Sequence, residues 1–289
     1  MAEYVISTDS TADLPLEYSK EHNIVIQDLS FSFGDEMYRG LSDMEPATFY
    51  KRMRDGDVAK TNACIPGNVR ASFEEILKSG KDILHISFSS GLSASYNVVK
   101  IVAEELATEF PDRKIAVIDS LAAAPGQGLL VHYCVLNHEK GMGFDENVKA
   151  MEDLKLHVCH EFTVEDLKYL ARGGRISKTT AVLGTIINVK PVLHVDNEGH
   201  LINIAKVRGR KQSLNALVDN MGTHLCDDFK NDIVFIGHGD SLADAEYVRD
   251  LVKERYGINN FMINYICPTI GAHSGPGTIA LFYLGKSRE

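Results

Sequence analysis

Strand-like and helix-like segments alternate along most of this chain, and that alternation limits its fold more than any other feature. Short runs rich in Val and Ile occur at residues 4–8, 82–87 and 114–118, with helix-like segments before and after them. Parallel neighbours in a sheet need a crossover of a dozen or more residues, which is usually a helix. The order therefore predicts an α/β fold with a largely parallel sheet flanked by helices.

The pattern changes after about residue 155. Two strand-like runs there flank Asn-Glu-Gly at 197–199, which is typical of a hairpin, and helices and strands follow in mixed order. We therefore expect two domains. An N-terminal α/β domain would cover residues 1–156, and a C-terminal mixed α/β domain would cover residues 157–289.

Hydroxyl residues mark the predicted starts of two helices. Ser93 is placed to cap a helix over 93–110, and Thr163 is placed to cap one over 164–172. A further apolar helix is expected over 179–188. The glycine-rich segment near the end of the chain, between the last two predicted strands, is expected to be a loop.

Composition argues against several classes of protein. The 289-residue chain carries a formal charge of −10, which argues against nucleic acid as a partner because phosphate binding needs clustered Lys and Arg. It lacks an apolar run of about 18 residues and a basic leader, so we expect a cytoplasmic protein. Five widely spaced cysteines favour reduced thiols. The nearest metal-ligand candidates, His157, Cys159 and His160, alternate between strand faces, so we expect no metal.

Motifs for nucleotide binding and serine hydrolysis lack sequence support. Gly126-Gln-Gly128 lacks the third glycine of a dinucleotide fingerprint, and no phosphate loop of the G-x-x-x-x-G-K-[ST] type occurs. The segment 90–93 does not match the nucleophile elbow of serine hydrolases. The sequence therefore gives no support for either of these two functions.

Loops rich in Gly and hydroxyl residues follow several predicted strands, at 7–11, 87–95, 119–120 and 271–277. Any one of them is ordinary turn chemistry. At the carboxyl edge of an open sheet, however, they would together line a crevice with hydrogen-bond donors. The helix expected to begin at Ser93 would direct free backbone N–H groups there, which favours an anion.

Several spaced motifs resemble those of the DegV family along nearly the whole chain. They are Ile6-Ser-Thr-Asp-Ser-Thr-Ala-Asp-Leu-Pro15, Ser90-Gly-Leu-Ser-Ala-Ser-Tyr96, Val117-Ile-Asp-Ser120, Asp166-Leu-Lys-Tyr-Leu-Ala-Arg-Gly-Gly-Arg-Ile-Ser177 and Gly271-Ala-His-Ser-Gly-Pro-Gly277. The resemblance implies a two-domain DegV-like fold with a fatty acid buried between and within the domains. It also implies service as the acyl-carrying subunit of a bacterial fatty acid kinase, whose partner phosphorylates the carboxylate for phospholipid synthesis.

The resemblance assigns Thr61, Ser93 and His273 as ligands of the carboxylate. The family pattern T-S-x-P-S reads T-N-A-C-I here, so Asn62 replaces a serine. Its amide can still donate to a carboxylate oxygen, and we add Asn62 to the expected site. Protonation of His273 would strengthen this contact. Neutral donors otherwise suit the task, because they hold a carboxylate without a deeply buried cation.

The same resemblance assigns Arg172 to phosphoryl transfer with the kinase, and Arg208 is a second candidate for that face. The ligand would be a fatty acid such as palmitate, stearate or oleate. We expect no other cofactor, and transient contact of the protein with a membrane is compatible with this function. Two alternatives stay open. One is a regulatory lipid sensor without a kinase partner. The other is an enzyme using Ser93 and His273 as nucleophile and base, although no orienting carboxylate is evident.

Overall fold

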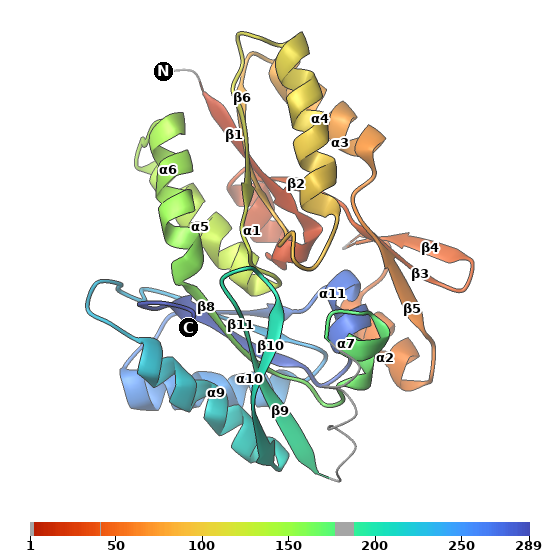
Figure 1. The fold of residues 1–289 in the computed structure, drawn as a ribbon, viewed down its shortest axis with the longest axis vertical. Coiled ribbons are helices and arrows are strands. Elements are labelled where there is room, and N and C mark those ends of the chain that lie inside the picture. The colour runs from red at the N-terminus through yellow and green to blue at the C-terminus, as the bar shows by residue number, and fades with distance from the viewer. Residues whose placement is uncertain (1–2, 41, 177–187) are drawn as a thin grey trace.

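The computed structural model describes residues 3–40, 42–176 and 188–289, and these residues form the expected mixed α/β fold (Figure 1). The first sheet has the order β2 (Val25–Gln27), β1 (Tyr4–Asp9), β6 (Asp82–Ser87) and β7 (Ile115–Asp119), with every pair parallel. Helices on both sides of this sheet are α3 (Pro66–Lys78), α4 (Ser95–Glu109), α5 (Pro125–Glu139) and α6 (Phe144–Leu154). All six residues of β6 are buried, as expected for a parallel strand covered on both faces.

The second sheet is mixed. Its order is β10 (Leu201–Arg208), β9 (Val189–Val195), β8 (Val158–Thr163), β13 (Ile279–Leu284), β11 (Val234–His238) and β12 (Phe261–Tyr265). Among these described strands only β11 and β12 pair in parallel. The β9–β10 pair confirms the predicted hairpin. One face of this sheet contacts α9 (Arg210–His224) and α10 (Leu242–Tyr256).

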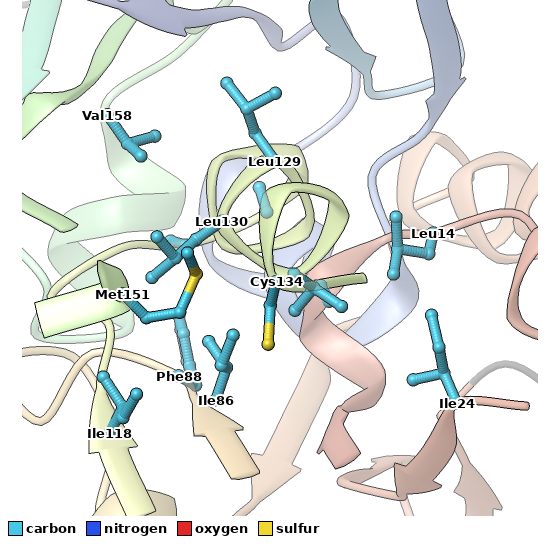
Figure 2. Close-up of a cluster of buried hydrophobic side chains, with 14 of the residues drawn as sticks. Leu14, Ile24, Ile86, Phe88, Ile118, Leu129, Leu130, Cys134, Met151 and Val158 are labelled. Atoms are coloured by element: carbon cyan, nitrogen blue, oxygen red, sulfur yellow. The ribbon is translucent and has the colours of Figure 1, made fainter. Parts of the chain in front are cut away.

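Helix α5 lies between the two sheets and contacts strands of both. In Figure 2, Leu130 of α5 lies between Val158 of β8 and Ile86 of β6, and all three are completely buried. Close approach explains the two glycines of its first turn. A Cβ atom at Gly126 would lie 2.4 Å from His160 Nε2, and one at Gly128 would lie 2.4 Å from the Ala12 carbonyl oxygen. The Gly-x-Gly pair therefore serves helix packing.

A small third sheet brings an early part of the chain against a late one. It consists of β4 (Glu36–Arg39), β3 (Ser30–Phe33) and β5 (Ala59–Asn62), and it packs with α2 (Pro46–Arg54) and α11 (Pro268–Ser274). The Tyr50 hydroxyl donates to the Ile266 carbonyl oxygen at 2.9 Å. Strand β5 was not predicted, and it carries two of the expected site residues.

Three predictions about the starts of helices are wrong. Helix α4 begins at Ser95, two residues after Ser93. Thr163 belongs to β8 and donates to the Pro191 carbonyl oxygen at 2.7 Å, so it caps no helix. The helix expected over 164–172 is limited to α7 (Lys168–Arg172).

The expected loop 271–277 is partly helical, because its first four residues are the end of α11. The remaining short helices are α1 (Leu16–Glu21), η1 (Ser10–Ala12) and η2 (Lys155–His157). Residues 179–187 of the predicted apolar helix lie outside the described ranges, and the domain boundary at residue 156 stays a prediction. Among the helices that the structure describes, none is both long and apolar enough to span a bilayer.

Candidate ligand-binding cavity

A cavity of about 210 Å³ lies between the carboxyl end of the parallel sheet, the mixed sheet and α11. Most of its wall is apolar, and it is formed by strands of the mixed sheet and by the loops that follow β6 and β7. The apolar wall includes Phe88, Leu92, Ala123, Phe162, Val195 and Phe282. Thr61, Asn62, Ser93 and His273, the four expected carboxylate ligands, all line the same cavity. The fold therefore brings together residues that are scattered in the sequence, while their role as ligands stays a prediction.

Thr61 and His273 make the central polar contact of this wall. Thr61 Oγ1 and His273 Nε2 are 2.8 Å apart, although the residues are 212 positions apart in the chain. Successive side chains of a strand point to opposite faces, so the next residue of β5 points elsewhere. Asn62 is exposed and its amide donates to Ser30 Oγ at 3.3 Å. Asn62 thus lies at the margin of the cavity and Thr61 within it.

Ser93 is held by the loop that follows β6. Asp9, at the end of β1, anchors that loop, because its Oδ2 accepts the Phe88 N–H at 2.6 Å and the Ser87 hydroxyl at 3.0 Å. Ser93 Oγ accepts the Ser95 N–H at 3.1 Å and lies 3.0 Å from Ser95 Oγ. This hydroxyl is therefore fixed beside the first turn of α4, at the cavity wall.

In the ligand-free protein His273 is neutral near pH 7, while the expectation that its protonation strengthens carboxylate binding stays a prediction. Burial, followed by the charges of Arg175 and Arg172, lowers the pKa of His273 to about 4. The other ring nitrogen faces α7, since a Cβ atom at Gly173 would lie 2.0 Å from His273 Nδ1. In the ligand-free protein His273 therefore acts as a neutral hydrogen-bonding group with Nε2 toward Thr61.

Arg175 also lines the cavity, and the site predicted from sequence did not include it. Its Nε donates to the Leu92 carbonyl oxygen at 3.0 Å, and Nη1 donates to the Gly173 carbonyl oxygen. Burial lowers the pKa of Arg175, but a guanidinium stays charged at neutral pH. A cation therefore stands beside the neutral donors. The signal in the sequence was the second arginine of the R-G-G-R segment.

The two arginines assigned to a kinase lie elsewhere. Arg172 is exposed at the end of α7, with its guanidinium carbon 5.2 Å from the centre of the Tyr169 ring. Arg208 is exposed at the end of β10. Neither residue belongs to the cavity wall formed by the described residues.

A nucleophile–base pair is not the arrangement seen here. His273 Nε2 contacts Thr61, and Ser93 contacts Ser95. General-base catalysis requires the base within hydrogen-bond reach of the nucleophile. The polar groups instead surround a cavity, which suits binding of a mostly apolar ligand with one polar end.

The fold and the cavity define an α/β protein with a mostly apolar cavity and a polar patch in its wall. The chain belongs to the DegV family, whose model matches residues 3–286. It is 38% identical over 291 residues to a DegV domain-containing protein of Clostridium perfringens, and the match covers 100% of both chains.

Solved DegV structures have the same fold. A stearic acid-binding protein from Eubacterium ventriosum is 26% identical, with a TM-score of 0.87 and 98% of each chain covered. DegV from Bacillus subtilis, described as a fatty acid binding protein, is 25% identical, with a TM-score of 0.85 and coverage of 99% of this chain and 100% of that chain. The present chain is similar to both proteins in sequence and in fold.

Proposed function

We propose that this protein binds a long-chain fatty acid in the cavity, with its carboxylate held by Thr61, Ser93 and His273. The observation that carries the proposal is that these three side chains line one mostly apolar cavity, with Thr61 and His273 in direct contact. The fatty-acid-binding relatives from Eubacterium ventriosum and Bacillus subtilis support it.

The two parts of such a ligand would contribute differently. Burial of a methylene group is worth roughly 0.8 kcal/mol, so a sixteen-carbon tail offers on the order of 10 kcal/mol before the costs of immobilisation. The tail therefore supplies most of the affinity. The hydroxyls and His273 set the orientation of the carboxylate, and the charge of Arg175 favours an anion at this end.

The first prediction is that the purified protein contains a fatty acid and that this ligand occupies the cavity. Mass spectrometry of extracted lipid identifies the acid. Ala280→Phe should abolish its retention, because Ala280 lines the cavity and is buried in β13. Ala205→Phe, on an exposed position of β10, is the control and should retain the lipid.

The polar patch is tested separately from the cavity. Ser93→Ala and His273→Ala should each weaken binding by roughly three- to tenfold, the equivalent of one hydrogen bond. Titration of the delipidated variants with palmitate measures the loss. Wild-type affinity in both variants would contradict the proposed carboxylate site.

We further propose that the protein presents the bound carboxylate to a fatty acid kinase, as a cytoplasmic, non-catalytic subunit without a cofactor of its own. The acyl phosphate would then enter phospholipid synthesis. The DegV resemblance is the support for this step. Arg172 is suited to phosphoryl transfer because it is exposed and because its charge contributes to the lowered pKa of His273.

A second prediction tests that step. Arg172→Ala should leave palmitate affinity unchanged but reduce acyl phosphate formation by a purified bacterial fatty acid kinase at least about tenfold, as for loss of a charge-stabilising group. Lys168→Ala, on the same helix, is the charge control. Equal loss of binding and phosphorylation would make Arg172 a structural residue. Lipid binding without any phosphorylation would instead favour the lipid sensor.

A further inference from the structure

Two hydroxyls in the cavity wall have no partner among the residues that the structure describes. They are Thr269 Oγ1 and Ser274 Oγ, and both residues are on α11, the helix that carries His273. Thr269 is 3% exposed and Ser274 is 6% exposed. Both line the cavity with Ile270 and His273, so one face of α11 forms this part of the wall.

An unpaired buried hydroxyl is costly, and native structures contain few of them. A helical threonine commonly bonds a backbone carbonyl three or four residues earlier. For Thr269 the nearer of these is the Ile266 carbonyl, which already accepts the Tyr50 hydroxyl at 2.9 Å. Thr269 Oγ1 makes no such bond, and because Thr269 lines the cavity a ligand atom there can satisfy this hydroxyl.

Helical spacing places Thr269 next to the carboxylate site but not at its centre. Residues four apart on a helix lie on one face with their Cβ atoms about 5–6 Å apart. His273 Nε2, beside Thr61, marks the expected carboxylate position. Thr269 is one turn away from His273, so it faces the part of a bound acyl chain that directly follows the carboxylate.

We propose that the cavity selects fatty acids that carry a hydroxyl group close to the carboxylate, and that Thr269 recognises this hydroxyl. The inference rests on the proposed fatty acid binding and names the class of acid. A threonine hydroxyl both donates and accepts, so it matches an alcohol on the chain. An unsubstituted chain puts a methylene there and leaves Thr269 unpaired.

The test compares two acids that differ by one hydroxyl. Delipidated wild-type protein is titrated by calorimetry with palmitate and with β-hydroxypalmitate. We expect β-hydroxypalmitate to bind roughly three- to tenfold more tightly, the gain from one added hydrogen bond. Thr269→Val, which replaces the hydroxyl by a methyl group of similar size, should remove this preference without weakening palmitate binding.

Two further variants keep the result interpretable. Ser274→Ala removes the other unpartnered hydroxyl of α11 and should retain the preference. Thr269→Ala also removes the Thr269 hydroxyl and should lose the preference, so it replaces Thr269→Val if that protein fails to fold.

Three outcomes would overturn the inference. They are equal affinities for the two acids in wild-type protein, a preference that survives in Thr269→Val, or an equal loss for both acids in that variant, which would make Thr269 a carboxylate ligand. Failure of wild-type protein to bind either acid would instead refute the proposed function itself.

Discussion

At the scale of single residues, Asp13 is a buried carboxyl group whose ionisation state affects the stability of the fold. It is 2% exposed, and its Oδ1 accepts the Cys267 N–H at 3.0 Å. Its Oδ2 has no partner among the described residues. Burial raises the pKa of Asp13 to about 8. The backbone at Asp13 is left-handed (φ 52°), and α1 begins three residues later, at Leu16.

A third prediction follows for pH dependence. Between about pH 4 and pH 8 the folded protein keeps a proton on Asp13 that the unfolded chain has lost. The free energy of unfolding attributable to Asp13 therefore falls as pH rises through this window. Asp13→Asn stays neutral, so its free energy of unfolding relative to wild type should increase by on the order of 1 kcal/mol per pH unit.

Urea unfolding of both proteins at several pH values measures this difference. Other titrating groups, such as buried Glu161, are present in both proteins and cancel in the comparison. A difference that does not change with pH would show that Asp13 is ionised in the folded protein throughout.

At the scale of elements, the contact between α7 and α11 sets the position of His273. The two helices are in contact, and Gly173, which directly follows α7, approaches the imidazole more closely than any residue with a Cβ atom allows. The same segment supplies Arg175 to the cavity. One short helix and the glycine after it therefore position two polar groups of the site.

A fourth prediction concerns this contact. Gly173→Ala should displace the His273 ring, because the new Cβ atom would lie 2.0 Å from Nδ1. We expect a loss of about 1–3 kcal/mol in stability and weaker palmitate binding. Gly67→Ala is the control, since a Cβ atom there meets no described atom within 4 Å. Wild-type affinity in Gly173→Ala would show that the ring position is unimportant for binding.

At the scale of the whole molecule, one buried arginine forms hydrogen bonds with segments that adjoin both large sheets. Arg288 is 2% exposed, and burial lowers its pKa to about 10, so it remains charged at neutral pH. It donates to backbone carbonyl oxygens that belong to both parts of the protein. These acceptors are on Ser120, Leu121, Lys155, Val158 and Asp196.

A fifth prediction tests this junction. Arg288→Met should lower the free energy of unfolding by about 3 kcal/mol or more, because several buried carbonyls lose a charged donor at once. Arg255→Met removes a partly exposed arginine paired with Asp219 and should cost no more than about 1 kcal/mol. Urea unfolding compares the two. Similar losses would mean that Arg288 contributes no more than a surface charge.

Local sequence signals were sufficient for the fold class and for most regular elements. The predicted strand 82–87 coincides with β6, and the predicted strand 4–8 is one residue shorter than β1. Buried parallel strands are apolar along their whole length, and surface helices repeat every 3.6 residues, so both leave a pattern in adjacent residues. The same local character made the motifs around Ser93 and His273 recognisable.

Only the tertiary structure decided how these motifs meet. The family resemblance placed Thr61 and His273 at one carboxylate, but the sequence did not indicate that a strand, β5, would carry Thr61 there. It also did not indicate that Arg175 would reach the cavity or that Thr163 would bond a neighbouring strand. These contacts join residues far apart in the chain. They depend on the packing of whole elements, which side-chain periodicity does not encode. The sequence by itself determined most of the regular elements and the family, whereas packing determined the shape of the cavity and the contacts among the polar groups that face it.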